Sequence, residues 1–82
     1  MQVIITPKAE RQYRHLPLSE QIKIKKKLLL LEKNPQEGKK LTGNLAEARS
    51  LKAWPYRIIY WIDEKHNKIF IVTIAHRQRV YK

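Results

Sequence analysis

Two long runs rich in β-branched and aromatic residues limit what this chain can fold into. They cover residues 56–62 and 68–76, and the stretch 63–67 that joins them consists of turn formers and charged residues. A connection this short joins antiparallel neighbours in one sheet. The start of one strand then lies beside the end of its partner, so we expect Arg57 to lie close to the segment that begins at His76.

The length and the lack of cysteine bound the rest of the fold. We expect one domain spanning residues 1–82, because half of this chain could not bury a core. Without cysteine there is neither a disulfide nor a thiolate metal site. The opening apolar run, Val3-Ile4-Ile5, is too short for a signal peptide, and no stretch approaches the ~20 apolar residues that span a bilayer. We therefore expect a cytoplasmic protein with no membrane partner.

The first forty residues predict a strand followed by a helical hairpin. Residues 2–6 read as a short strand, and Thr6-Pro7 supplies an N-cap followed by proline at the first helical position. A first helix is expected over residues 7–16. Pro17 or Ser19 opens a second helix, which continues to about residue 33.

The second helix should end in a left-handed cap at Asn34, followed by Pro35. Lysines at positions 23, 26 and 27 are expected to form its solvent-exposed face, and Leu30 lies outside its apolar stripe. That stripe covers about half of the helical wheel and comprises Ile22, Ile24, Leu28, Leu29 and Leu31. Because four consecutive leucines exceed what one packed face needs, we expect a partner chain to cover part of the run.

The remainder of the chain predicts three further strands. Residues 36–48 are polar, include both glycines and read as a loop, after which strand character returns at 49–53. Trp54-Pro55 forms a corner, because proline cannot donate to a central ladder. The resulting order is β-α-α-β-β-β. It predicts an α+β fold with the helical hairpin packed on one face of a small, largely antiparallel, four-stranded sheet.

Strand alternation assigns the side chains of the third strand to two faces. Ile58, Tyr60 and Ile62 share one face, and Arg57, Ile59 and Trp61 share the other. The fourth strand, 68–76, is apolar on both faces. This pattern is typical of a central strand that is buried on both sides.

The charge balance narrows the classes of function. Eighteen Lys and Arg residues against seven Asp and Glu residues give a net charge of +11, which favours a polyanionic partner such as nucleic acid or an acidic protein. His15, His66 and His76 share no metal-ligand spacing, and the acidic residues form no cluster. No Gly-rich phosphate loop or serine elbow is present. What remains is a site of cationic and aromatic side chains, with no metal and no cofactor.

Arg57 and Arg77 are the central candidates for that site. Paired guanidinium groups can clamp a phosphate and stabilise charge on its non-bridging oxygens without a metal. His76 suits proton transfer because the reference pKa of histidine is ~6.5, but alternation puts it on the opposite face from Arg77, where a structural role is equally open. The supporting candidates can bind phosphate, move a proton or stack on bases, or can simply pack: Arg49, Lys52, Trp54, Trp61 and Tyr81.

In order and spacing, the chain resembles the RelE/ParE toxin superfamily, and most closely its RelE-like branch. The resemblance covers nearly all 82 residues. It is carried by the end of the helical hairpin at 31–35, the connector Lys40-Leu41-Thr42-Gly43, the strand entry 51–60 and the ending Ile74 to Tyr81.

This resemblance implies the toxin of a type II toxin–antitoxin system. Such toxins are metal-free endoribonucleases that cut mRNA in the ribosomal A site and contact 16S rRNA there. An acidic, partly disordered antitoxin would neutralise the toxin, and only the complex of the two would bind operator DNA. The leucine run, with Leu28, Leu30 and Leu31, is the expected antitoxin dock.

The resemblance also assigns roles to single residues. Arg57 and Arg77 match the family's phosphate-stabilising arginines, and Tyr81 matches a tyrosine that orients or stacks on the substrate. Lys52, Arg49, Arg79 and Trp54 are the expected RNA-binding residues. The second strand departs from the family pattern, because Ala48 and Ser50 stand where two lysines are expected. Lys52, Arg49 and His76 are therefore all candidates for the general base. A ParE-like toxin, which inhibits DNA gyrase without RNA cleavage, is the alternative, and a chain that has lost cleavage is a third.

Overall fold

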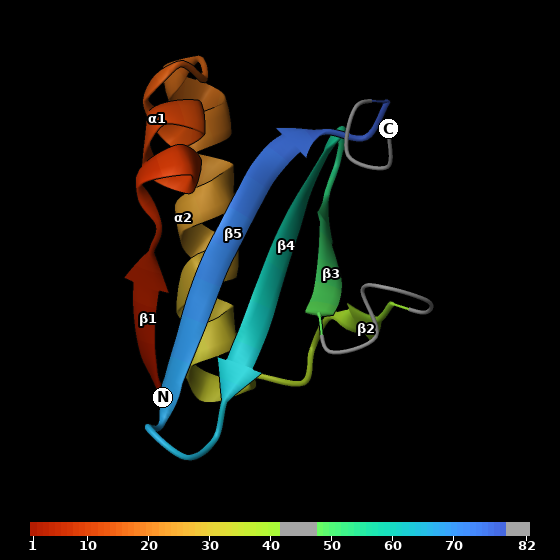
Figure 1. The fold of residues 1–82 in the computed structure, drawn as a ribbon. Helices are drawn as coiled ribbons and strands as arrows, with labels where there is room; N and C mark the ends of the chain where they lie inside the picture. Colours follow the sequence, from red (N-terminus) through yellow and green to blue (C-terminus); the bar gives the residue numbers. More distant parts are fainter. Residues whose placement is uncertain (42–47, 79–82) are drawn as a thin grey trace.

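The computed structural model of the protein describes residues 1–41 and 48–78. These residues form a five-stranded sheet with both helices on one of its faces (Figure 1). The elements are β1 (Gln2–Ile5), α1 (Pro7–Arg14), α2 (Leu18–Lys33), β2 (Lys39–Lys40), β3 (Ala48–Ala53), β4 (Tyr56–Asp63) and β5 (Lys68–His76). The strand order is β1-β5-β4-β3-β2, in which the β1–β5 pair is parallel and the other pairs are antiparallel. The predicted α+β class and largely antiparallel sheet are confirmed.

Thr6 starts α1 as predicted and also ties that helix to the sheet. Its hydroxyl oxygen accepts a hydrogen bond from the Ala9 N–H at 3.3 Å and donates to the Ile71 carbonyl of β5 at 2.8 Å. Ala9 is fully buried, and Tyr13 and Leu16 pack against the core from the same side of the helix. Neither helix of the described residues is long and apolar enough to cross a membrane.

Asn34 ends α2 in a different way from the one predicted. Its φ of −139° and ψ of 80° are extended, so the prediction of a left-handed cap is wrong. The cause is Pro35, whose ring disfavours helical conformations of the preceding residue and pushes it towards extended ones. The Asn34 N–H still reaches the Leu30 carbonyl at 2.9 Å, and its side-chain amide donates to Glu37 at 2.9 Å.

The apolar stripe of α2 is narrower than the sequence pattern predicted. Leu28 and Leu31 are core residues, 8% and 0% exposed, and pack against the sheet. Their expected contact with an antitoxin stays a prediction. Leu30 stays accessible, at 37%. Ile22 and Leu29 were assigned to the core face, yet each is 52% exposed.

The segment expected to be a loop over residues 36–48 contains the short edge strand β2. Lys39 pairs with Ser50 and Lys40 with Arg49, so the described sheet has five strands rather than the expected four. Two consecutive lysines carry no alternation of apolar and polar residues. This strand forms through backbone pairing, and no side-chain pattern in the sequence predicts it.

A β-bulge in β5 keeps the core continuous. Ile59 pairs with Thr73 whereas Tyr60 pairs with Ile71, which leaves Val72 as the extra residue. Ile71 before the bulge and Ile74 after it therefore both face the helices and are buried.

The other face of the sheet carries Arg57, Ile59 and Trp61, since the alternate residues Ile58 and Tyr60 of β4 belong to the core; we call it the outer face. No helix of the described residues covers it, and Trp61 is 52% exposed. Phe70, the cross-strand partner of Trp61, is only half-buried. β5 is therefore a central strand between β1 and β4, as predicted, but its outer face is only half-buried.

Candidate functional site

Two basic side chains lie next to each other on the outer face, where β3 ends and β4 begins. Lys52 of β3 pairs with Arg57 of β4, and Arg57 pairs in turn with Ala75 of β5. Directly paired residues on one face have Cβ atoms roughly 5 Å apart, so both cations can contact one phosphate. Lys52 is exposed and Arg57 is half-buried.

Arg77 follows two residues after Ala75 and is held at the same end of the sheet. Its N–H donates to the Pro55 carbonyl at 2.9 Å, and its guanidinium carbon lies 4.5 Å from the ring centroid of Trp54. Trp54 is itself 60% exposed, so this cation–π contact sits at the surface. We call the group Lys52, Trp54, Arg57 and Arg77 the basic corner.

Lys23 supports the basic corner from α2. Its ammonium donates to the Trp54 carbonyl at 2.8 Å and pairs with Glu20 at 3.1 Å. The sequence pattern placed Lys23 on a solvated face. Its role here depends on the path of the Trp54-Pro55 turn, which helical periodicity does not report.

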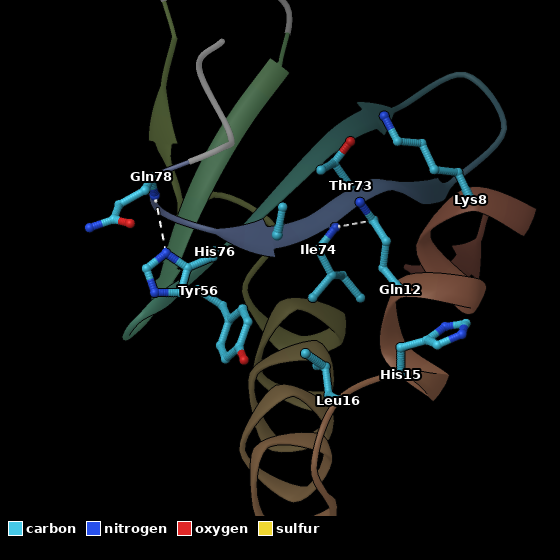
Figure 2. A pocket seen from close by; sticks show the side chains of 10 residues that line it. Lys8, Gln12, His15, Leu16, Tyr56, Thr73, Ile74, His76 and Gln78 are labelled. Atoms are coloured by element: carbon cyan, nitrogen blue, oxygen red, sulfur yellow. Dashed lines mark hydrogen bonds between the residues drawn. The ribbon is translucent and has the colours of Figure 1, made fainter.

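His76 lies on the opposite face of the sheet from Lys52 and Arg57. Its ring meets the edge of Tyr56, its cross-strand partner, with centroids 5.8 Å apart and an interplanar angle of 78°. Both rings line an open cleft of about 730 Å³, whose other side is formed by Gln12 of α1 and by His15, which follows that helix. Figure 2 shows Tyr56 and His76 on one side and Gln12 on the other. The imidazole of His76 therefore lies outside the basic corner, although His76 directly precedes Arg77 in the chain.

Arg49 also faces the helix side, because it pairs with the buried Tyr60. Its guanidinium donates to the Gly38 carbonyl at 2.8 Å and the Gln36 carbonyl at 3.4 Å. The structure therefore separates Arg49 from Lys52, its expected neighbour in a single basic surface. Strand alternation predicts this separation, because residues three positions apart on a strand point to opposite faces.

The shifted pKa values belong to groups outside the basic corner. The side chain of His66 hydrogen-bonds Asp63 at 2.8 Å and holds the pKa of that carboxyl below its ordinary value. Burial raises the pKa of Tyr60. Asp63 ends β4, whereas Arg57 begins it.

Two expected site residues, Arg79 and Tyr81, lie outside the described residues, and their roles stay predictions. Within the ranges 1–41 and 48–78, no group of three or more His, Asp or Glu side chains gathers as a metal site would need.

Replacing Trp54 by alanine tests how Arg77 is held. We expect the loss of the ring contact to release the guanidinium at a cost of about 0.5–1 kcal/mol, typical of an exposed cation–π pair. Chemical denaturation checks that figure, with Trp61→Ala as the matched loss of an exposed tryptophan. An equal loss in both variants would contradict a specific role for Trp54.

Comparison with known proteins gives a consistent result. The family model described as "ParE toxin of type II toxin-antitoxin system, parDE" matches residues 3–81. Toxin RelG of Mycobacterium tuberculosis is 36% identical over 45 residues, which are 55% of this chain and 52% of that protein. The match thus spans about half the length of this curated relative.

Solved structures share the fold over nearly the whole chain. The toxin–antitoxin complex RelBE2 from Mycobacterium tuberculosis contains a chain that matches with a TM-score of 0.86 at 29% identity, covering 93% of this chain and 96% of its own. The isolated E. coli RelE toxin matches with a TM-score of 0.82 at 22% identity, covering 98% and 87%. The fold is therefore that of the RelE/ParE toxins. The chain belongs to the family of ParE toxins of type II toxin–antitoxin systems, as its resemblance to the superfamily predicted.

Proposed function

We propose that this toxin is a metal-free endoribonuclease that cuts mRNA on the ribosome and so inhibits translation. The observation that carries the proposal is the basic corner, where Lys52 and Arg57 are paired and Arg77 is held at the same end of the sheet. Three cations at one exposed end suit a phosphodiester whose charge grows during reaction. The RelE-like relatives support the same conclusion at the level of the fold.

In the proposed reaction, the 2′-hydroxyl attacks the adjacent phosphorus. A bond from O2′ to phosphorus forms as the bond to O5′ breaks, leaving a 2′,3′-cyclic phosphate and a 5′-hydroxyl. Arg57 and Arg77 donate hydrogen bonds to the non-bridging oxygens. Of the three candidate bases, we favour Lys52, because it alone lies on the outer face beside Arg57. One of the two arginines, Arg57 or Arg77, also acts as the general acid that returns a proton to O5′.

The second candidate function is inhibition of DNA gyrase without RNA cleavage. The match of the ParE toxin model to residues 3–81 favours this function, because the family model carries the name of the ParE branch. The basic corner would then bind an acidic surface of the target and make no covalent change.

We also propose an acidic antitoxin as partner, acting in the cytoplasm. Similar folds are found in toxin–antitoxin complexes, including RelBE2 and E. coli RelBE. A net charge of +11 and the exposed Leu30 on α2 suit a partner that is both acidic and apolar. Operator DNA would be bound only by the toxin–antitoxin complex.

An in-vitro translation reaction separates the two candidate functions. We expect the purified protein to produce codon-phased mRNA ends, mapped by primer extension, and to leave gyrase supercoiling unaffected. The control is Arg11→Ala, which removes an exposed arginine of α1 away from the basic corner and should cleave normally. Intact mRNA together with blocked supercoiling would favour the gyrase inhibitor instead.

A further inference from the structure

The chain reversal after β5 is held by two hydrogen bonds and one ring contact. The Gln78 N–H donates to Nδ1 of His76 at 3.3 Å, and the Arg77 N–H donates to the Pro55 carbonyl at 2.9 Å. The Arg77 side chain rests on Trp54. Figure 2 shows the first bond, which joins the main chain at Gln78 to the imidazole of His76. The direction of the Arg77 side chain thus depends on groups on both sides of it in the sequence.

The imidazole of His76 is poorly placed to touch a phosphate bound at the basic corner. It packs edge-on against Tyr56 and borders the cleft between α1 and the sheet. Lys52 and Arg57 project from the other face. Any effect of His76 on a ligand at the corner must pass through the main chain at Arg77.

The bond to Gln78 also defines the protonation state of His76. Because a backbone N–H can only donate, Nδ1 must supply a lone pair, and the ring proton then sits on Nε2. Protonating Nδ1 would turn two N–H groups towards each other and break this bond.

We infer that His76 is a positioning residue: its neutral Nδ1 fixes the turn at residues 76–78 and so sets Arg77 on Trp54. It acts through the backbone and carries no proton of the reaction. This goes beyond the proposed function, because it concerns the geometry of Arg77 whatever the basic corner binds. Only its activity readout depends on RNA cleavage.

Three titratable groups share the cleft with His76. Lys8 comes from α1, His15 directly follows that helix, and Tyr56 comes from β4. His15 is the other imidazole that lines the cleft. A His15→Gln background therefore leaves His76 as the imidazole of this cleft whose protonation is followed.

The first test observes the turn directly. In protein labelled with ¹⁵N, we expect the His76 ring to be the Nε2–H tautomer near neutral pH. When acidification protonates the His76 ring, the Gln78 amide and the Arg77 Nε proton, which lies near the Trp54 ring, should shift together. An Nδ1–H tautomer, or an Arg77 signal that ignores the titration, would overturn the inference without reference to any enzymatic activity.

The second test uses two substitutions. The Oδ1 atom of asparagine can accept the Gln78 N–H much as Nδ1 does, so His76→Asn should keep the Arg77 signal and make it independent of pH. His76→Ala should show the low-pH signal throughout. If His76→Ala does not fold, the wild-type tautomer and the His76→Asn titration still decide.

In the cleavage assay, His76→Ala should lower kcat about 10-fold or more by misplacing Arg77, and His76→Asn should restore it to within about 3-fold. The wild-type rate should fall more steeply on acidification than the His76→Asn rate, whose remaining slope reports the general base Lys52. Equal losses in both variants, with the Arg77 signal intact in His76→Asn, would make His76 a proton carrier and overturn the inference. If wild-type protein cuts no RNA, the proposed function fails and the spectroscopic tests still stand.

Discussion

Arg77→Ala is expected to lower the rate of mRNA cleavage by about 10²–10³-fold, the cost of removing one donor to a developing oxyanion. The fold holds Arg77 through the Pro55 carbonyl, which accepts from its N–H, and through the Trp54 ring. Its contribution should appear in kcat rather than KM, because charge on the non-bridging oxygens grows in the transition state. Single-turnover cleavage of a ribosome-bound mRNA measures it.

Two companion variants sharpen this experiment. Arg77→Lys keeps the charge but loses the planar fork that donates two parallel hydrogen bonds, so it should recover only a small part of the rate. Arg11→Ala removes the same side chain from α1 and should have no effect. If Arg77→Lys cleaved as fast as wild type, Arg77 would act as a simple charge, and the clamp on the phosphate would be refuted.

The sequence predicted those parts of the fold that side-chain periodicity specifies. The strands at 56–62 and 68–76 appear as β4 and β5 with bounds within one residue, and Thr6 caps α1. Periodicity also implies that His76 and Arg77 face opposite ways. The bulge at Val72 changes the alternation upstream, and His76 pairs with Tyr56. Arg77 follows the last residue of β5, so its face relative to His76 stays a prediction.

The features that were missed depend on contacts between distant segments. Strand β2 exists because Lys39 and Lys40 meet the backbone of β3, and nothing in two lysines encodes that meeting. Lys23 reaches Trp54 across 31 positions of sequence. The predicted apolar stripe on α2 is wider than the buried one, because position on the helical wheel does not tell which apolar residues the sheet covers. Ile22 therefore remains half-exposed, although Ile24 is fully buried.

Gly38→Ala is expected to be the most destabilising small change in the described residues, at roughly 2–3 kcal/mol. A Cβ atom on Gly38 would lie 2.6 Å from the Tyr60 hydroxyl oxygen and 2.7 Å from its Cε1. Tyr60 cannot yield, since its ring is fully buried. Its hydroxyl donates to the Pro35 carbonyl at 2.7 Å and accepts from the Gly38 N–H at 2.8 Å. Urea denaturation measures the loss, and Gln36→Ala, at an exposed position of the same segment, is the control.

Tyr60→Phe should separate the hydrogen bonds from the packing. It leaves the Pro35 carbonyl and the Gly38 N–H without this partner and should cost about 1–3 kcal/mol. In the double variant with Gly38→Ala, the clash with the hydroxyl disappears while the clash at Cε1 persists. The two losses should therefore sum to more than the loss of the double variant. Strict additivity would mean that Gly38 and Tyr60 do not constrain each other.

The same hydroxyl gives the fold an alkaline limit. Burial raises the pKa of Tyr60, against the opposing effects of the Gly38 N–H and Arg49. A raised pKa means that the folded state prefers the neutral phenol. This contribution is complete below the unfolded pKa of about 10 and is lost as pH rises through the folded pKa. Wild type should therefore lose stability above about pH 10 more steeply than Tyr60→Phe. Parallel curves of unfolding free energy against pH would show that the Tyr60 hydroxyl ionises as easily in the folded as in the unfolded chain. The contact of Tyr60 with residues 35–38 would then stabilise the fold through packing alone.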